Sequence, residues 1–157
     1  MSLTPGQRAT RSLTLGPDKV RAFAELTGDY NPLHFDEAFA ARTRFGRPLV
    51  NSTFTLALVT GLTVPDTSEN ATANLAWTDI TLPKPVFVGD TIWAESEILE
   101  LRESASRPTM GIVSMRCRGV NQHGEIVIEF RRTFMAYRRG APEAEPAFPD
   151  VRGGWTV

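Results

Sequence analysis

The feature that most constrains the fold is an uncharged run from Asn51 to Val64 in the first half of the chain. Asn51 and Ser52 are both favourable helix caps, and Gly61 and Pro65 stand near the expected end of the run. An uncharged helix of this length is normally buried on nearly all sides. The run therefore predicts a central helix covered by other elements, and its β-branched residues leave a buried strand as the alternative.

Elements of a different kind surround this run. Alternating apolar residues and turn signals predict long strands in the second half of the chain and a short strand near its start. The predicted strands are 10–15, 74–82, 90–102, 110–120 and 125–138. Two further helices are expected, at 17–27 and 36–42, with Gly28 stopping the first and Asp36 capping the second. An antiparallel sheet wrapped around a long central helix satisfies this pattern, so the expected fold class is α+β.

Composition narrows the class of protein. A chain of 157 residues with net charge −1 is expected to be one domain and no general nucleic-acid binder. It has one cysteine, Cys117, which we interpret as a buried core thiol. The sequence shows neither a signal peptide nor a membrane-spanning stretch, so we expect a cytoplasmic protein with no membrane partner. The body is expected at 1–139, followed by a Pro/Gly-rich tail at 140–157 that is draped on it through Phe148 and Trp155.

The stretch from Thr27 to His34 carries the candidate chemistry. It places the carboxylate of Asp29 and the imidazole of His34 five positions apart across an Asn-Pro turn. A carboxylate and an imidazole aimed at one water are the minimum apparatus for adding water to, or removing it from, an activated carbon–carbon double bond. Taken singly, the same residues are an ordinary helix stop, an ordinary turn and a surface or hydrogen-bonded histidine.

Three blocks together resemble a known family. The Thr27–His34 octet resembles the hydratase motif of MaoC-like, or R-specific, enoyl-CoA hydratases. Phe45–Pro48 and Leu82–Asp90 match the same family in order, so the resemblance covers about 10–138. Membership implies a hot-dog fold, usually a homodimer or a higher homo-oligomer, and an acyl-CoA substrate. No separate cofactor is implied, since the substrate itself carries coenzyme A.

The run from Arg47 to Leu62 is similar to a narrower branch, the mesaconyl-CoA (β-methylmalyl-CoA) hydratases. Typical R-specific hydratases have His-Gly where this chain has Asn51-Ser52. The family's oxyanion donor is the backbone N–H at the second of these positions, and a backbone donor does not need glycine. The added side chains imply a reshaped pocket and an altered acyl group. Some enzymes of this branch are longer and contain two such domains.

The resemblance implies a role for each matching residue. Asp29 would accept a proton from water, His34 would hold the same water, and Asn31 would orient the water or the carboxylate. The backbone N–H of Ser52 would face the thioester oxygen. The predicted substrate-binding residues are Arg47, Pro48 and Asn51, with Arg47 either touching the CoA phosphates or lying on the rim.

Other interpretations remain at this point. A hot-dog thioesterase and a non-catalytic acyl-CoA-binding subunit of a heteromeric dehydratase are the alternative functions. No metal site is expected, because the spacing of the nearby acidic residues and histidine matches no compact ligand pattern. Trp77 and Trp93 are interpreted as packing residues. We interpret four arginines as solvated charges: Arg102, Arg107, Arg116 and Arg118. The alternative is that they contact a nucleotide phosphate at a dimer edge.

Overall fold

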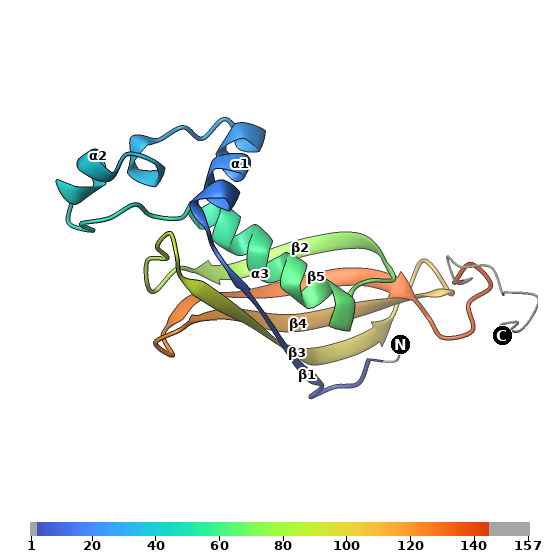
Figure 1. Ribbon diagram of the computed structural model, residues 1–157. Helices are drawn as coiled ribbons and strands as arrows, with labels where there is room; N and C mark the ends of the chain where they lie inside the picture. Colours follow the sequence, from blue (N-terminus) through green and yellow to red (C-terminus); the bar gives the residue numbers. More distant parts are fainter. Residues whose placement is uncertain (1–2, 145–157) are drawn as a thin grey trace, which may run out of the picture.

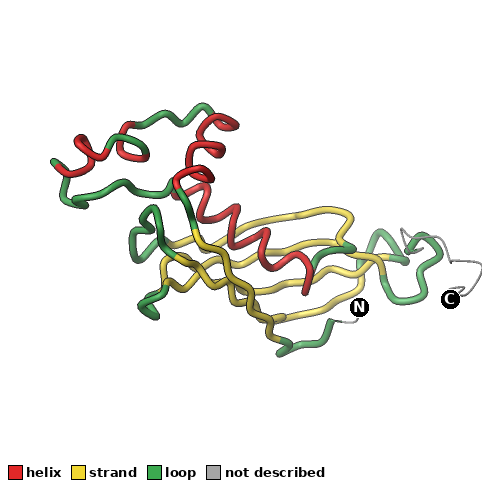
Figure 2. The backbone as a smooth tube through the Cα atoms, in the orientation of Figure 1, coloured by secondary structure: helices red, strands yellow, loops and turns green. Residues whose placement is uncertain are grey.

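A five-stranded antiparallel sheet with one long helix lying across it forms the body of the molecule (Figures 1 and 2). The computed structural model describes residues 3–144. The strands are β1 (Arg8–Thr14), β2 (Ala71–Thr81), β3 (Thr91–Glu103), β4 (Met110–Asn121) and β5 (Ile126–Tyr137). Their order across the sheet is β1-β3-β4-β5-β2, so β1 and β2 are the edges. The strand predictions are confirmed; the largest difference is at β2, expected from residue 74 and found from Ala71.

The short helices form where the local sequence places them. Helix α1 spans Pro17–Thr27 and ends at Gly28, which has a φ of 74° and donates its N–H to the carbonyl of Ala24. Helix α2 spans Glu37–Ala41, and the side chain of its cap Asp36 accepts the N–H of Phe39. A 3₁₀ turn, η1 (Pro32–His34), lies between them. These segments overhang one end of the sheet (Figure 1).

The central helix α3 is longer than predicted. It spans Ser52–Thr67 and contains Pro65, which was expected to close the run. Proline costs a helix one backbone hydrogen bond, so the local sequence predicts that the helix ends at Pro65. A tertiary contact favours the longer helix, because Arg11 of β1 donates to both carboxylate oxygens of Asp66, at 2.5 and 3.0 Å. The N–H of Ser68 closes the last turn.

Helix α3 is buried on one side only within the chain. Thr55, Leu58, Val59 and Thr63 are buried against the sheet. The opposite side carries exposed residues at a spacing of four: Thr53, Ala57, Gly61 and Pro65. The expectation of burial on nearly all sides is therefore wrong for a single copy, since the sheet covers one face of the helix and the described residues place no second layer over the other.

A glycine sets how closely α3 approaches the sheet. A Cβ on Gly119 of β4 would lie 2.9 Å from methyl carbons of both Val59 and Ile128. The absent side chain lets Val59 pack directly on the strand. Around this contact the core is apolar and fully buried, with Ile92 and Phe134 among its largest members.

Several single-residue predictions have clear outcomes. Cys117 is buried, and burial raises the pKa of its thiol to about 12, which confirms a core thiol. Arg116 and Arg118 pair with glutamates on β3 as solvated strand charges. The packing role expected of Trp77 and Trp93 is wrong within this chain, because the two residues are 44% and 37% exposed.

The expected tail contacts through Phe148 and Trp155 lie outside the described residues, and the domain boundary at 139 stays a prediction. Among the helices of residues 3–144, none is long and apolar enough to cross a membrane.

Candidate functional site

The octet lies where the overhang meets the first turn of α3. Gly28 ends α1 and turns the chain, so Asp29 follows directly on a helix C-terminus. The η1 turn then brings His34 back toward the same place. The carboxylate remains 44% exposed, whereas the imidazole is only 11% exposed. An accessible base beside a fixed ring is a suitable arrangement for holding a small polar reactant.

The structure brings the two predicted side chains together. His34 Nε2 lies 3.5 Å from Asp29 Oδ2, and His34 Nδ1 lies 2.8 Å from the carbonyl oxygen of Leu49. A carbonyl can only accept, so Nδ1 carries the proton, and in the neutral ring Nε2 presents a lone pair toward the carboxylate. Two acceptors then face each other. One water donating a proton to each satisfies both groups.

The carbonyl that orients His34 belongs to a well-anchored segment. Val50 N–H donates to the carbonyl of Val86 at 2.8 Å, and Val88 N–H donates to the carbonyl of Pro48 at 3.3 Å. The segment around Leu49 is therefore paired like a short strand with the loop that precedes β3. This pairing fixes the ring orientation of His34. Neither the sequence around residue 48 nor that around residue 86 indicates that the two segments pair.

The side chain that holds the carboxylate is Asn51, a contact that the sequence analysis missed. Asn51 Nδ2 donates to Asp29 Oδ2 at 2.5 Å. Asn31 is predicted to orient the water or the carboxylate; its Oδ1 accepts the N–H of Leu33, its backbone N–H donates to Asp29 Oδ1 at 3.4 Å, and its role toward the water stays a prediction. The contact was missed because Asn51 stands directly before an uncharged helix, and an asparagine at that position predicts a helix cap.

The first turn of α3 presents free donors. Asn51 is the N-cap residue, yet its side chain accepts no backbone hydrogen bond, and the first intrahelical bond runs from Thr55 N–H to its carbonyl. Within residues 3–144, the N–H groups of Ser52, Thr53 and Phe54 meet no acceptor. They lie at the positive end of the helix dipole, where a developing negative charge is stabilised.

The remaining predicted residues lie at the edge of this region. The Arg47 guanidinium stacks over the ring of Phe87 at 3.9 Å and is 4.0 Å from Asp90 Oδ1, with its side chain half exposed. Pro48 contributes its backbone carbonyl to the pairing with Val88. Substrate contact by Arg47, Pro48 and Asn51 stays a prediction.

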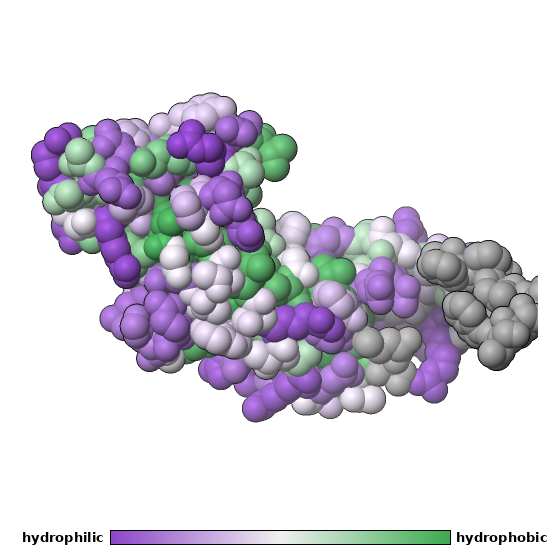
Figure 3. Space-filling model, viewed as in Figure 1, coloured by the Kyte–Doolittle hydropathy of each residue, from purple (hydrophilic) through white to green (hydrophobic). Residues whose placement is uncertain are grey.

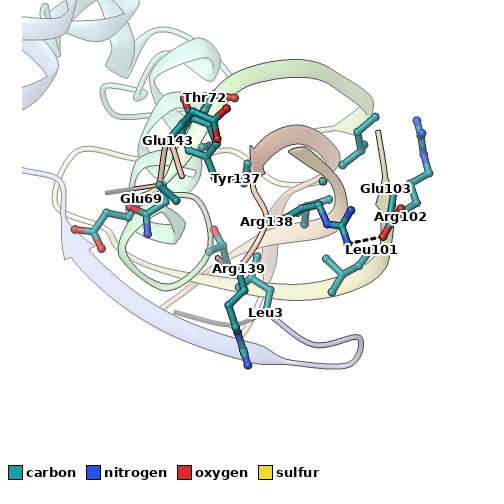
Figure 4. Close-up of a pocket in the computed structure, with 18 of the residues that line it drawn as sticks. Leu3, Glu69, Thr72, Leu101, Arg102, Glu103, Tyr137, Arg138, Arg139 and Glu143 are labelled. Atoms are coloured by element: carbon teal, nitrogen blue, oxygen red, sulfur yellow. Dashed lines mark ion pairs between the residues drawn. The ribbon is translucent and has the colours of Figure 1, made fainter. Parts of the chain in front are cut away.

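A cavity of about 920 Å³ lies elsewhere, at the other end of α3 (Figure 4). Figure 4 shows charged and polar side chains around it, with Arg138 paired to Glu103 at 2.6 Å. None of the residues that line it belongs to the octet or to the first turn of α3. In the part of the chain that the structure describes, no three His, Cys, Asp or Glu side chains are grouped to hold a metal ion.

The sheet wrapped on a helix, with an acid–imidazole pair at the start of that helix, defines a hot-dog protein with a candidate acid–base site. The chain belongs to the MaoC-like domain family, whose model matches residues 3–115. A Mycobacterium tuberculosis protein described as a double hotdog fold superimposes with a TM-score of 0.78 over 97% of this chain and 45% of that one, at 23% identity. At that identity the likeness establishes the fold alone.

Two curated relatives are similar in sequence. The mesaconyl-CoA hydratase of Cereibacter sphaeroides is 45% identical over 98 residues, which are 61% of this chain and 28% of that protein. The (R)-specific enoyl-CoA hydratase of Aeromonas caviae is 40% identical over 109 residues, covering 69% of this chain and 81% of that one. The chain thus spans less than a third of the first relative and most of the second.

Proposed function

We propose that this protein is a hydro-lyase that adds water to, or removes it from, the C2–C3 bond of an enoyl-CoA thioester. The observation that carries the proposal is the acid–imidazole pair, Asp29 Oδ2 and His34 Nε2, 3.5 Å apart at the uncapped start of α3. The names of the two relatives, both hydratases of CoA thioesters, support the same chemistry.

The residues suggest how the reaction proceeds. A water bound between the two side chains gives a proton to Asp29 as its oxygen attacks C3. The π electrons of the double bond move through C2 onto the thioester oxygen, which the N–H of Ser52 and the helix dipole stabilise. Asp29 then returns its proton to C2, so that water is added with no net change at the enzyme. His34, fixed by the Leu49 carbonyl, keeps the water aligned throughout.

The narrower proposal concerns the acyl group. Mesaconyl-CoA/β-methylmalyl-CoA, or a related branched C4–C5 acyl-CoA, is the proposed substrate. The similarity to the Cereibacter sphaeroides enzyme supports it, as does the presence of side chains at Asn51 and Ser52, where typical R-specific hydratases have His-Gly. The substrate brings its own coenzyme A, and the proposal requires no further cofactor.

A second copy of the chain is the proposed partner. The outer edge of β2 is unpaired among the described residues and exposes Leu75, Trp77 and Ile80. Figure 3 shows apolar patches among near-neutral residues over α3 on the side away from the sheet. An antiparallel edge is complementary to itself, so pairing two copies through β2 is proposed to cover both surfaces. Sedimentation of Trp77→Lys against the unmodified chain tests this: dissociation is expected, and an unchanged mass contradicts it.

The activity is tested by following the conjugated-enoyl absorbance when the purified protein meets mesaconyl-CoA, with crotonyl-CoA alongside and free thiol measured in parallel. Loss of absorbance without thiol release supports the hydratase. Activity with crotonyl-CoA alone keeps the chemistry and contradicts the branched substrate. Thiol release contradicts the hydratase in favour of a thioesterase, and no reaction by folded protein contradicts it in favour of a non-catalytic subunit.

A further inference from the structure

We propose that Asn51 is a positioning residue for the hydration step, and that it serves two groups at once. Its amide holds the Asp29 carboxylate, and the same orientation keeps its side chain off the free N–H groups at the start of α3. The inference rests on the proposed function, since it assigns a task within that site. Three observations on this one side chain carry it.

The first observation is the direction of the amide. Asn51 is 1% exposed, and its Nδ2 donates to Asp29 Oδ2, the oxygen that also faces His34. The reverse orientation would place two acceptor oxygens against each other, so the hydrogen bond itself fixes the assignment. A donor to a carboxylate makes a charge-assisted bond, which is shorter and stronger than a neutral one. Asn51 therefore restrains the carboxylate in the direction of the imidazole.

The second observation is that this orientation is costly. Asn51 Oδ1 is buried and meets no hydrogen-bond donor within the described part of the chain. A buried acceptor without a donor destabilises the fold, and such atoms are few in native structures. An apolar side chain of the same shape would avoid the cost. The amide is therefore a poor choice for stability alone, which points to a function of its donor half.

The third observation is a cap that is not made. Asparagine is among the best N-cap residues because its oxygen accepts a backbone N–H from the first turn. Asn51 occupies the N-cap of α3 with a φ of −56° and a ψ of 135°, yet makes no such bond. Turned toward Asp29, it leaves the N–H groups of Ser52 and its neighbours available to the thioester oxygen. A conventional cap would compete for these donors and release the carboxylate.

The decisive variant is Asn51→Leu, which keeps the shape and removes both halves of the amide. A positioning role predicts a kcat lower by roughly 10- to 100-fold, with KM within about threefold of the unmodified chain. The melting temperature should stay within about 2 °C, because removal of the unpartnered buried Oδ1 offsets the lost hydrogen bond to the Asp29 carboxylate, which is 44% exposed and can bond to water instead. A residue that only stabilises the fold would show the opposite pattern, with a lower melting temperature and an unchanged kcat per folded molecule, and that result would overturn the proposal.

A control and a rescue complete the experiment. Thr63→Val removes another buried polar group of α3, whose hydroxyl donates to the carbonyl of Thr60 at 2.7 Å. It should lower the melting temperature and leave kcat and KM unchanged. Asn51→His restores an N–H donor at the same place and should recover part of the kcat lost in Asn51→Leu. Equal kcat values in the leucine and histidine variants would contradict the role of the donor.

A spectroscopic readout separates this inference from the proposed function. The side-chain amide protons of Asn51 are identified by NMR from their absence in Asn51→Leu. They should resonate apart from those of other asparagines and move to ordinary positions in Asp29→Ala, because the charged acceptor is then missing. This holds even where the protein hydrates no thioester. Unmoved amide signals would overturn the positioning role, and absent activity with moved signals would overturn only the proposed function.

Discussion

The two ends of α3 are built on opposite principles. At the last turn, Arg132 donates to Ser68 Oγ at 2.9 Å and to Asn74 Oδ1 at 2.7 Å, and Arg11 grips Asp66. At the first turn the amides are uncapped and Asn51 holds an unpartnered oxygen. The last turn of the helix, the fastened end, is held by side-chain hydrogen bonds. The first turn has N–H groups and an amide oxygen that lack partners among the residues that the structure describes.

This difference shows where to look for chemistry. Satisfied polar groups stabilise a fold, whereas unsatisfied ones cost free energy and persist where they serve another purpose. The large cavity lies at the fastened end, yet the acid–imidazole pair lies at the other. The acid–imidazole pair and the free donors of the first turn therefore locate the candidate site, and cavity volume does not. A matched pair of charge removals at the two ends tests the comparison.

The largest effect is expected at the first turn. Asp29→Asn should lower kcat for enoyl-thioester hydration by roughly 10²–10⁴, because it removes the proposed general base. The melting temperature should change little, since the carboxylate is 44% exposed. Steady-state kinetics and thermal unfolding on the same sample measure both. If the variant retains most of its activity, the active site does not lie at this end of the helix.

A large effect on stability is expected at the last turn. Arg132→Met should lower the free energy of unfolding by about 1–3 kcal/mol, because the buried Ser68 hydroxyl and the side-chain oxygen of Asn74 lose their donor. Burial already lowers the pKa of Arg132, so the charge is costly and its removal offsets part of the loss. Urea denaturation measures the change. Activity per folded molecule should be retained, and its loss would mean that the two ends are coupled.

A smaller effect is expected for the change that matches Asp29→Asn at the other end. Asp66→Asn should reduce the melting temperature by a few degrees at most and leave the kinetics unaltered. The hydrogen bond from Arg11 lowers the pKa of Asp66 from its ordinary 3.8. Its stabilisation is thus present above that value and is lost as the pH falls through the lower folded pKa. The melting temperatures of Asp66→Asn and the unmodified chain should therefore become equal at acid pH. A difference that persists there would exclude the ion pair as its cause.

The smallest expected signal is the reactivity of Cys117 in the core that both ends share. Its pKa of about 12 leaves the thiol protonated at pH 8, and burial blocks access to it. Labelling by a thiol reagent should be negligible in native protein and rapid in urea. Arg132→Met should label faster than Asp29→Asn, because only the former weakens the body. Equal rates in these two variants would show that the last turn does not stabilise the core.

The sequence by itself determined the features whose causes are local. Gly28 ends α1, Asp36 caps α2 and alternation marks the strands, because each depends on residues within a few positions. It also determined the octet, since one turn between two helices carries both Asp29 and His34. Order along the chain was enough to propose a sheet around a central helix.

Only the tertiary structure decided the rest. Residue 66 continues α3 because Arg11 reaches it from 55 positions away, and Asn51 meets Asp29 across 22. The Leu49 carbonyl selects the tautomer of His34 through a pairing with the loop before β3. A hydrogen bond between residues far apart leaves no periodic pattern in either segment. The sequence therefore shows which groups are present, and the packing of distant segments determines which of them meet.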